Sequence, residues 1–145
     1  MRHHPRRSRC SGCGRTHVLL AASMLVRRAD GVAVIGAALV AKSAGAGHRT
    51  IAAGNGRPAS TVRGWLRRFG GRAEQLRVLF TGLLHALDAS AGALLPTGSV
   101  FSDALTALGA AAAAAVRLFG PRCPWQFTAA ASAGLLLSSG RVGVR

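Results

Sequence analysis

Apolar residues recur at helical spacing in three stretches of the chain. The stretches are 29–46, 58–69 and 73–89, and in each the apolar positions lie mostly three or four residues apart. This spacing places apolar side chains on one face of an α-helix, where they can be buried together. The apolar positions are Val32, Ile35 and Leu39; Val62, Trp65, Leu66 and Phe69; and Leu76, Leu79, Phe80, Leu83, Leu84 and Leu87. We therefore expect a mainly α protein.

Residues that begin and end helices separate these stretches. Asp30 stands at the start of the first helix, where a carboxylate suits the exposed N–H groups. Residues 48–53 form a helix of barely two turns, followed by the turn "GNGRP". Pro58 suits the first position of the next helix, because its missing N–H is not needed there. Residues 73–89 then give the clearest amphipathic helix of the chain.

The last third of the chain has a different composition. Residues 90–99 are a linker by composition, and Ser102 is placed to cap a helix over 103–119. A further helix can follow Pro124. Because of its alanine block we treat 90–145 as a low-complexity tail that is either helical or disordered. The longest apolar run within it is too short for a transmembrane span and is stopped by an arginine.

Positive charge is concentrated in the first half of the chain. The formal net charge is +15; residues 1–73 hold 14 Lys and Arg against one acid, and residues 74–145 hold 5 Arg against three acids. A GC-rich genome raises the arginine content of any protein, but it would act on both halves. The asymmetry therefore indicates a polyanionic partner for the first half, either nucleic acid or an anionic membrane surface.

The N-terminal segment, 1–26, combines a basic arm with a cysteine pair. We expect residues 1–9 to be disordered until they bind something, and "THVLL" to form a short strand after a tight turn. The apolar run 18–26 has the length of a signal peptide, but it ends in arginines rather than at a small-residue cleavage site. The three cysteines give no disulfide framework. Together these features favour a cytoplasmic protein.

Cys10 and Cys13 have the spacing of one zinc knuckle, with glycines suited to its turns. A structural zinc site takes four nitrogen or sulfur ligands, so this pair supplies half of one. His3, His4, His17 or Cys123 could complete the site, although none has a familiar spacing. The alternative is a half-knuckle with free thiols and no zinc.

The stretch "HRTIAAGNGRPASTVRGWLRRF" meets the requirements of a helix-turn-helix motif in order. Ile51 and Ala52 can face inward from a short first helix, and Gly56 can supply a left-handed turn residue. Residues 29–70 are thus a predicted DNA-binding domain whose recognition helix is 58–69. Its candidate DNA contacts are Arg57, Ser60, Thr61, Arg63, Arg67, Arg68, His48 and Arg49. The alternative is an ordinary helical hairpin with a solvated arginine face.

Preceded by "RCSGCGRTHVLL", this stretch resembles the helix-turn-helix segment of transposases and resolvase-type recombinases. Over residues 5–88 the chain is similar to an actinobacterial family of zinc-ribbon and helix-turn-helix proteins associated with insertion elements. The family pattern has an earlier Cys-x-x-Cys pair, so the resemblance implies an N-terminally truncated member. Asn55 departs from the pattern, which has an apolar residue there, and its amide needs a partner if buried. Gly54 and Gly64 each cost a helix about 1 kcal/mol relative to alanine.

No set of side chains suited to catalysis is evident, and we expect no enzyme activity. The four acids lie at 30, 74, 88 and 103, spacings that assemble no metal-binding triad by themselves. His85 belongs to the polar row of its helix. The leading hypothesis is a protein that binds double-stranded DNA, with a homodimer through helix 73–89 as a further possibility. The alternatives are a basic protein of the membrane surface and a non-functional transposon remnant.

Overall fold

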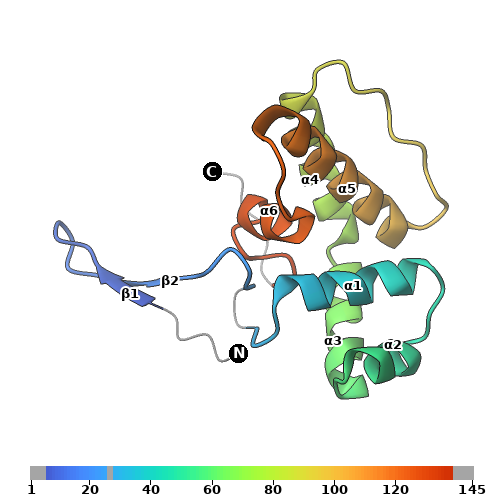
Figure 1. The fold of residues 1–145 in the computed structure, drawn as a ribbon, viewed down its shortest axis with the longest axis horizontal. Coiled ribbons are helices and arrows are strands. Elements are labelled where there is room, and N and C mark those ends of the chain that lie inside the picture. Colours follow the sequence, from blue (N-terminus) through green and yellow to red (C-terminus); the bar gives the residue numbers. More distant parts are fainter. Residues whose placement is uncertain (1–5, 26–27, 139–145) are drawn as a thin grey trace.

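The computed structural model describes residues 6–25 and 28–138, and this part of the chain is mainly helical (Figure 1). A small antiparallel sheet precedes the helices. This architecture confirms the expected fold class at the level of a mainly α protein. The elements are β1 (Arg6–Arg9), β2 (Thr16–Leu19), α1 (Val32–Ser43), α2 (His48–Asn55), α3 (Ala59–Gly70), α4 (Ala73–Leu87), α5 (Val100–Phe119) and α6 (Pro124–Ala131).

Two helix starts differ from the sequence prediction. α3 begins at Ala59, and Pro58 is its N-cap in an extended conformation rather than its first helical residue. α5 begins at Val100, with Ser99 as its N-cap, so Ser102 lies inside the helix and does not cap it. The Ser102 hydroxyl instead lies 2.8 Å from the Ser43 hydroxyl at the end of α1. Ser102 thus contacts α1 instead of capping α5, as the sequence had suggested.

α4 and α5 form the most extensive helix pair, and the same core continues into α1–α3. α4 contributes bulky side chains such as Phe80 and Leu76, while the buried residues of α5 are mostly alanines. Small side chains let two helix backbones approach closely, which explains why an alanine-rich sequence packs here. Of the two alternatives for residues 90–145, the helical one holds for the stretches occupied by α5 and α6.

α6 packs against both α1 and α5. The Trp125 ring lies directly on Gly36 of α1, where a Cβ atom would overlap it. The packing of the Trp125 ring on Gly36 therefore holds α6 against α1.

The strands β1 and β2 form a hairpin that extends away from the helices (Figure 1). Arg6 pairs with Leu19 and Arg9 with Thr16. β2 confirms the predicted strand, but the expectation of a disordered arm is wrong for residues 6–9, because their backbone bonds to β2. Residues 1–5 lie outside the described part of the chain. Every side chain from residue 6 to residue 20 is exposed, so the hairpin adds nothing to the helical core.

α5 is long and apolar enough to cross a membrane when judged by length and composition alone. Its most apolar window has a mean hydropathy of 1.3, and 39% of that window is buried against the rest of the protein. The sequence prediction of no span considered a shorter run, because it did not extend the helix to Val100. A core helix of a soluble protein passes the same test, so this finding is weak evidence for a membrane.

Candidate nucleic-acid interface

The turn between α2 and α3 has the geometry that the sequence predicted. Gly56 adopts the left-handed conformation, with φ 61° and ψ 36°, which glycine enters without steric cost. The N–H of Arg57 then donates to the Ala52 carbonyl at 3.1 Å and closes the end of α2. The chain reverses within three residues, and α3 starts at once on a new axis.

The inward face of this helix pair is buried as expected. Ile51 and Ala52 of α2 are 5% and 4% exposed, and Val62, Trp65 and Phe69 of α3 are nearly inaccessible. Trp65 therefore belongs to the core and is not a platform for base stacking. Because these side chains are fixed against α1, the outward residues of α3 have a defined direction.

The outward face of α3 presents Ser60, Arg63 and Arg67. These positions follow a spacing of three and four residues, so they share one side of the helix, and all three are exposed. Among the described residues no hydrogen bond or ion pair engages either arginine. The two guanidinium groups are thus available to a ligand in solution.

Arg57 makes an ion pair that the sequence did not indicate. Its Nε donates to Asp30 Oδ1 at 2.5 Å, an ion pair whose carboxylate is largely shielded from solvent. Asp30 consequently does not cap α1, whose N-cap is Gly31 and has no side-chain cap. The pair ties the turn before α3 to the segment before α1. We regard Arg57 as a residue that positions the turn.

Thr61 and Arg68 lie at the border of the outward face and are half-buried. The Arg68 guanidinium occupies space that Gly64 leaves open, since a Cβ there would stand 2.9 Å from Arg68 Nη1. Arg68 also lies close enough to Arg28 to affect it: burial first, and then the charge of Arg68, lowers the pKa of Arg28. Because that atom is the far end of a flexible side chain, Arg68 can move aside from a larger residue at position 64.

At the start of α2, His48 is the first helical residue, as predicted, and is half-buried, while Arg49 is exposed. The first backbone N–H groups of a helix attract anions, so Arg49 stands where a phosphate would be favoured.

At the other end of α2, Asn55 is half-buried and its Nδ2 has no hydrogen-bond partner. The sequence indicated that a buried Asn55 amide would need a partner, and the structure shows Nδ2 without one.

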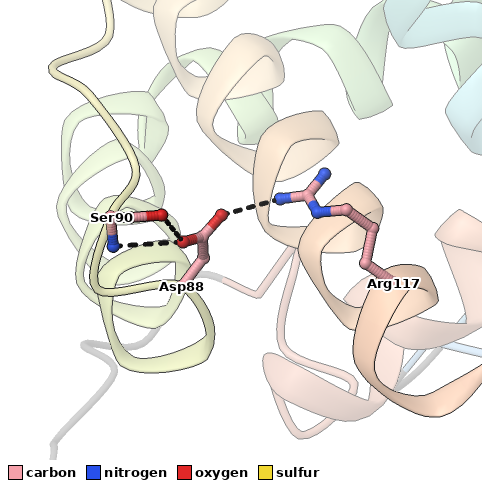
Figure 2. A network of polar contacts seen from close by, with 3 residues as sticks. All are labelled: Asp88, Ser90 and Arg117. Atoms are coloured by element: carbon pink, nitrogen blue, oxygen red, sulfur yellow. Dashed lines mark hydrogen bonds and ion pairs between the residues drawn. The ribbon is translucent and has the colours of Figure 1, made fainter.

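The acidic residues of the chain are all engaged. Glu74 binds Arg77 at 2.6 Å, and Asp103 accepts hydrogen bonds from the backbone and hydroxyl of Thr97, each at 2.7 Å. Figure 2 shows the third group, in which the Asp88 carboxylate bonds to Ser90 and to Arg117 at the far end of α5. With Asp30 paired to Arg57, no aspartate or glutamate side chain is left to neutralise the outward arginines of α3.

Cys10 and Cys13 lie in the loop that joins β1 and β2, and both are exposed. The backbone N–H of Cys13, the Cys13 thiol and the backbone N–H of Gly12 donate to the Cys10 sulfur and lower the pKa of Cys10. The Gly14 N–H donates to the Cys10 carbonyl at 2.9 Å. A thiolate held by backbone N–H groups suits a metal, so this donor pair fits one half of a zinc site.

The described residues hold no group of three or more histidine, cysteine or acidic side chains that could bind a metal together. His17 lies on β2, opposite Ser8, and Cys123 precedes α6. His3 and His4 lie outside the described residues. The described residues therefore bring together two of the four ligands that a structural zinc site needs, and zinc binding stays a prediction.

No protein-family model, curated protein or solved structure matches the chain. The resemblance to insertion-element proteins therefore stays a prediction. What can be argued about function depends on the residues and their geometry.

Proposed function

We propose that this protein binds duplex DNA by placing α3 in the major groove. The observation that carries the proposal is the outward face of α3, where Arg63 and Arg67 stand exposed and unpaired on a helix fixed by the buried Trp65. A helix that reads a groove needs both properties, a rigid inner face and an outer face rich in donors. A purely structural helical hairpin needs only the first.

The side chains divide between two kinds of contact. Arginine can donate two parallel hydrogen bonds to guanine, so Arg63 and Arg67 are the candidates for base contacts, supported by Ser60 and Thr61. Arg49, His48 and Arg68 are the candidates for phosphate contacts, which fix the register of a protein on DNA. Arg57 acts through the turn that it holds to Asp30.

The biological setting that we propose is a mobile element. The protein would be a cytoplasmic partner of transposition or recombination that binds DNA and carries out no reaction itself. Two copies joined through α4 would present two recognition helices to two half-sites. The exposed Val78 and an apolar groove between α4 and α6 support such a contact.

The membrane-surface alternative has one feature in its favour, the apolar composition of α5. Its alanines, however, are buried in the same core as α4, which gives the helix a partner without lipid. We therefore prefer the nucleic-acid ligand.

Binding of the purified chain to random-sequence duplex DNA across a salt series tests the proposal. Because binding releases counterions, we expect the logarithm of the association constant to fall linearly and steeply with the logarithm of salt concentration. Anionic liposomes are the comparison ligand. Flotation with liposomes in the absence of DNA binding would contradict the proposal and support the membrane alternative. Failure to bind either ligand would support a non-functional remnant.

A further inference from the structure

Arg72, between α3 and α4, is a buried arginine without an acidic partner. Its side chain is 6% exposed. Nη1 donates to the Ser138 carbonyl at 3.0 Å and to the Ser138 hydroxyl. Nε and Nη2 are both buried and have no hydrogen-bond acceptor. Burial of the guanidinium lowers the pKa of Arg72.

The two atoms without an acceptor form one edge of the guanidinium group. The N–H groups of Nε and Nη2 point in the same direction, and together they can hold two oxygens of one carboxylate or phosphate. In Arg122 both atoms of the corresponding edge have acceptors. Nε donates to the Gly120 carbonyl at 3.2 Å, and Nη2 donates to the Phe119 carbonyl at 2.7 Å. On Arg72 the corresponding pair has nothing to bind.

A second arginine binds the same segment as Arg72. Arg28 donates from Nη2 to the Leu137 carbonyl at 3.1 Å, so Arg28 and Arg72 bind carbonyls of successive residues. Arg68 lies next to Arg28. The chain has only four acidic side chains, and all of them are engaged elsewhere. Within the chain, no aspartate or glutamate remains to compensate Arg72.

We propose that the Nε and Nη2 edge of Arg72 binds a small tetrahedral oxyanion of the phosphate class. Arg72 also precedes the first turn of α4, where a negative charge is favoured. The ligand is a free anion rather than the backbone of a nucleic acid, because the edge lies below the surface that a duplex could contact. This site is separate from the outward face of α3.

The anion reaches the site when the segment ending at Ser138 opens. Residues 132–138 form turns rather than a helix or strand, and Leu136 and Leu137 hold the segment by their burial. Local opening of a segment without a helix or strand needs less free energy than global unfolding. Bound phosphate would bridge Arg72 to its neighbours and stabilise the folded chain.

Thermal unfolding in phosphate and in chloride at matched ionic strength tests this site without DNA, so its outcome is independent of the DNA-binding proposal. We expect phosphate at ten times its dissociation constant to raise the Tm of the wild-type chain by about 5 °C. The variant Arg72→Lys keeps the charge and loses the two-pronged edge, so the rise should disappear. In the control Arg122→Lys, whose edge is already satisfied by carbonyls, the rise should persist. Equal rises in all three proteins would overturn the proposal.

A second measurement needs only the wild-type chain and remains decisive if Arg72→Lys does not fold. In an NMR titration of arginine Nε–H signals with inorganic phosphate, one slowly exchanging signal should shift in a saturable manner. Random-sequence duplex DNA, added in phosphate-free buffer, should leave that signal unchanged. Absence of a saturable shift with phosphate, or a shift with DNA alone, would overturn the proposal.

Discussion

At the level of single residues, the contact between Gly36 and Trp125 determines how α6 meets α1. The indole ring occupies the space where a side chain at position 36 would lie, so only glycine fits without displacing the ring or the helix. Gly54 is a useful contrast, because it lies in a helix with no atom within 4 Å of an added Cβ. The same substitution should therefore have opposite effects at the two positions.

We expect Gly36→Ala to lower the free energy of unfolding by about 1–3 kcal/mol, because the new methyl group overpacks the contact with Trp125. Gly54→Ala should raise it by up to about 1 kcal/mol, because alanine favours the helix. Urea unfolding of both variants beside the wild-type chain checks the pair. Two changes of the same sign would mean that α6 does not pack on α1 through this ring.

Asp88 is the residue that joins the end of α4 to the end of α5 (Figure 2). Hydrogen bonds from the Ser90 side chain and backbone, and then from Arg117, lower the pKa of Asp88 below its ordinary value. The folded state therefore binds this proton more weakly than the unfolded state does. The resulting stabilisation is complete above a pH of about 4 and is lost as the pH falls further.

The variant Asp88→Asn has no carboxylate to protonate, so its free energy of unfolding should decrease less between neutral pH and pH values below about 4. Some decrease should remain, because hydrogen bonds from Arg77 and from Thr97 also lower the pKa of Glu74 and Asp103 respectively. Denaturant unfolding at a series of pH values measures the difference. A pH dependence identical to that of the wild-type chain would show that the Asp88 contacts do not persist in solution.

At the level of elements, the pairing of α4 with α5 depends on the small size of the alanines in α5. Ala111 is fully buried in the shared core, whereas Ala113, two residues further, is exposed. We expect Ala111→Leu to destabilise the protein by about 1–3 kcal/mol through overpacking, while Ala113→Leu should change stability by less than about 0.5 kcal/mol. Thermal unfolding compares the two. Equal tolerance of both would mean that α5 does not pack on α4 as the structure shows.

The positions of the helices could be predicted from the sequence because their apolar spacing is strong. Val62, Trp65 and Phe69 are buried as their spacing indicated, and Gly56 makes the left-handed turn. The start of α5 was misplaced, because two serines are close together at this helix start. Ser99 is the N-cap, whereas the Ser102 hydroxyl contacts that of Ser43.

Some contacts left no local signal in the sequence. The pairing of Arg57 with Asp30 spans 27 residues, and the bond from Arg72 to Ser138 spans 66. Neither follows from periodicity or from motif spacing, because long-range partners are fixed only when the helices assemble. The burial of the inward face of α2 and α3 was accordingly predicted correctly, while the contacts of Arg57 and Arg68 required the structure.

At the level of the whole molecule, the positive charge on the outward face of α3 is not neutralised by any aspartate or glutamate of the chain. The four acids bind other arginines or hydroxyl and backbone donors. The outward arginines of α3 have no such partner, and the exposed hairpin adds Arg6, Arg7 and Arg9. A chain with this arrangement attracts polyanions over distances set by the ionic strength.

The central claim is that α3 contacts DNA through its outward arginines, and a charge-matched pair of double variants tests it most directly. Arg63→Ala with Arg67→Ala removes two charges from α3, whereas Arg117→Ala with Arg122→Ala removes two charges from the last turn of α5 and the segment after it. We expect the first variant to bind duplex DNA at least about tenfold more weakly at low salt. Its salt slope should also be shallower by about two counterions. The second variant should keep the slope of the wild-type chain. Equal losses in both variants would contradict the account, since the binding would then depend on total charge and not on α3.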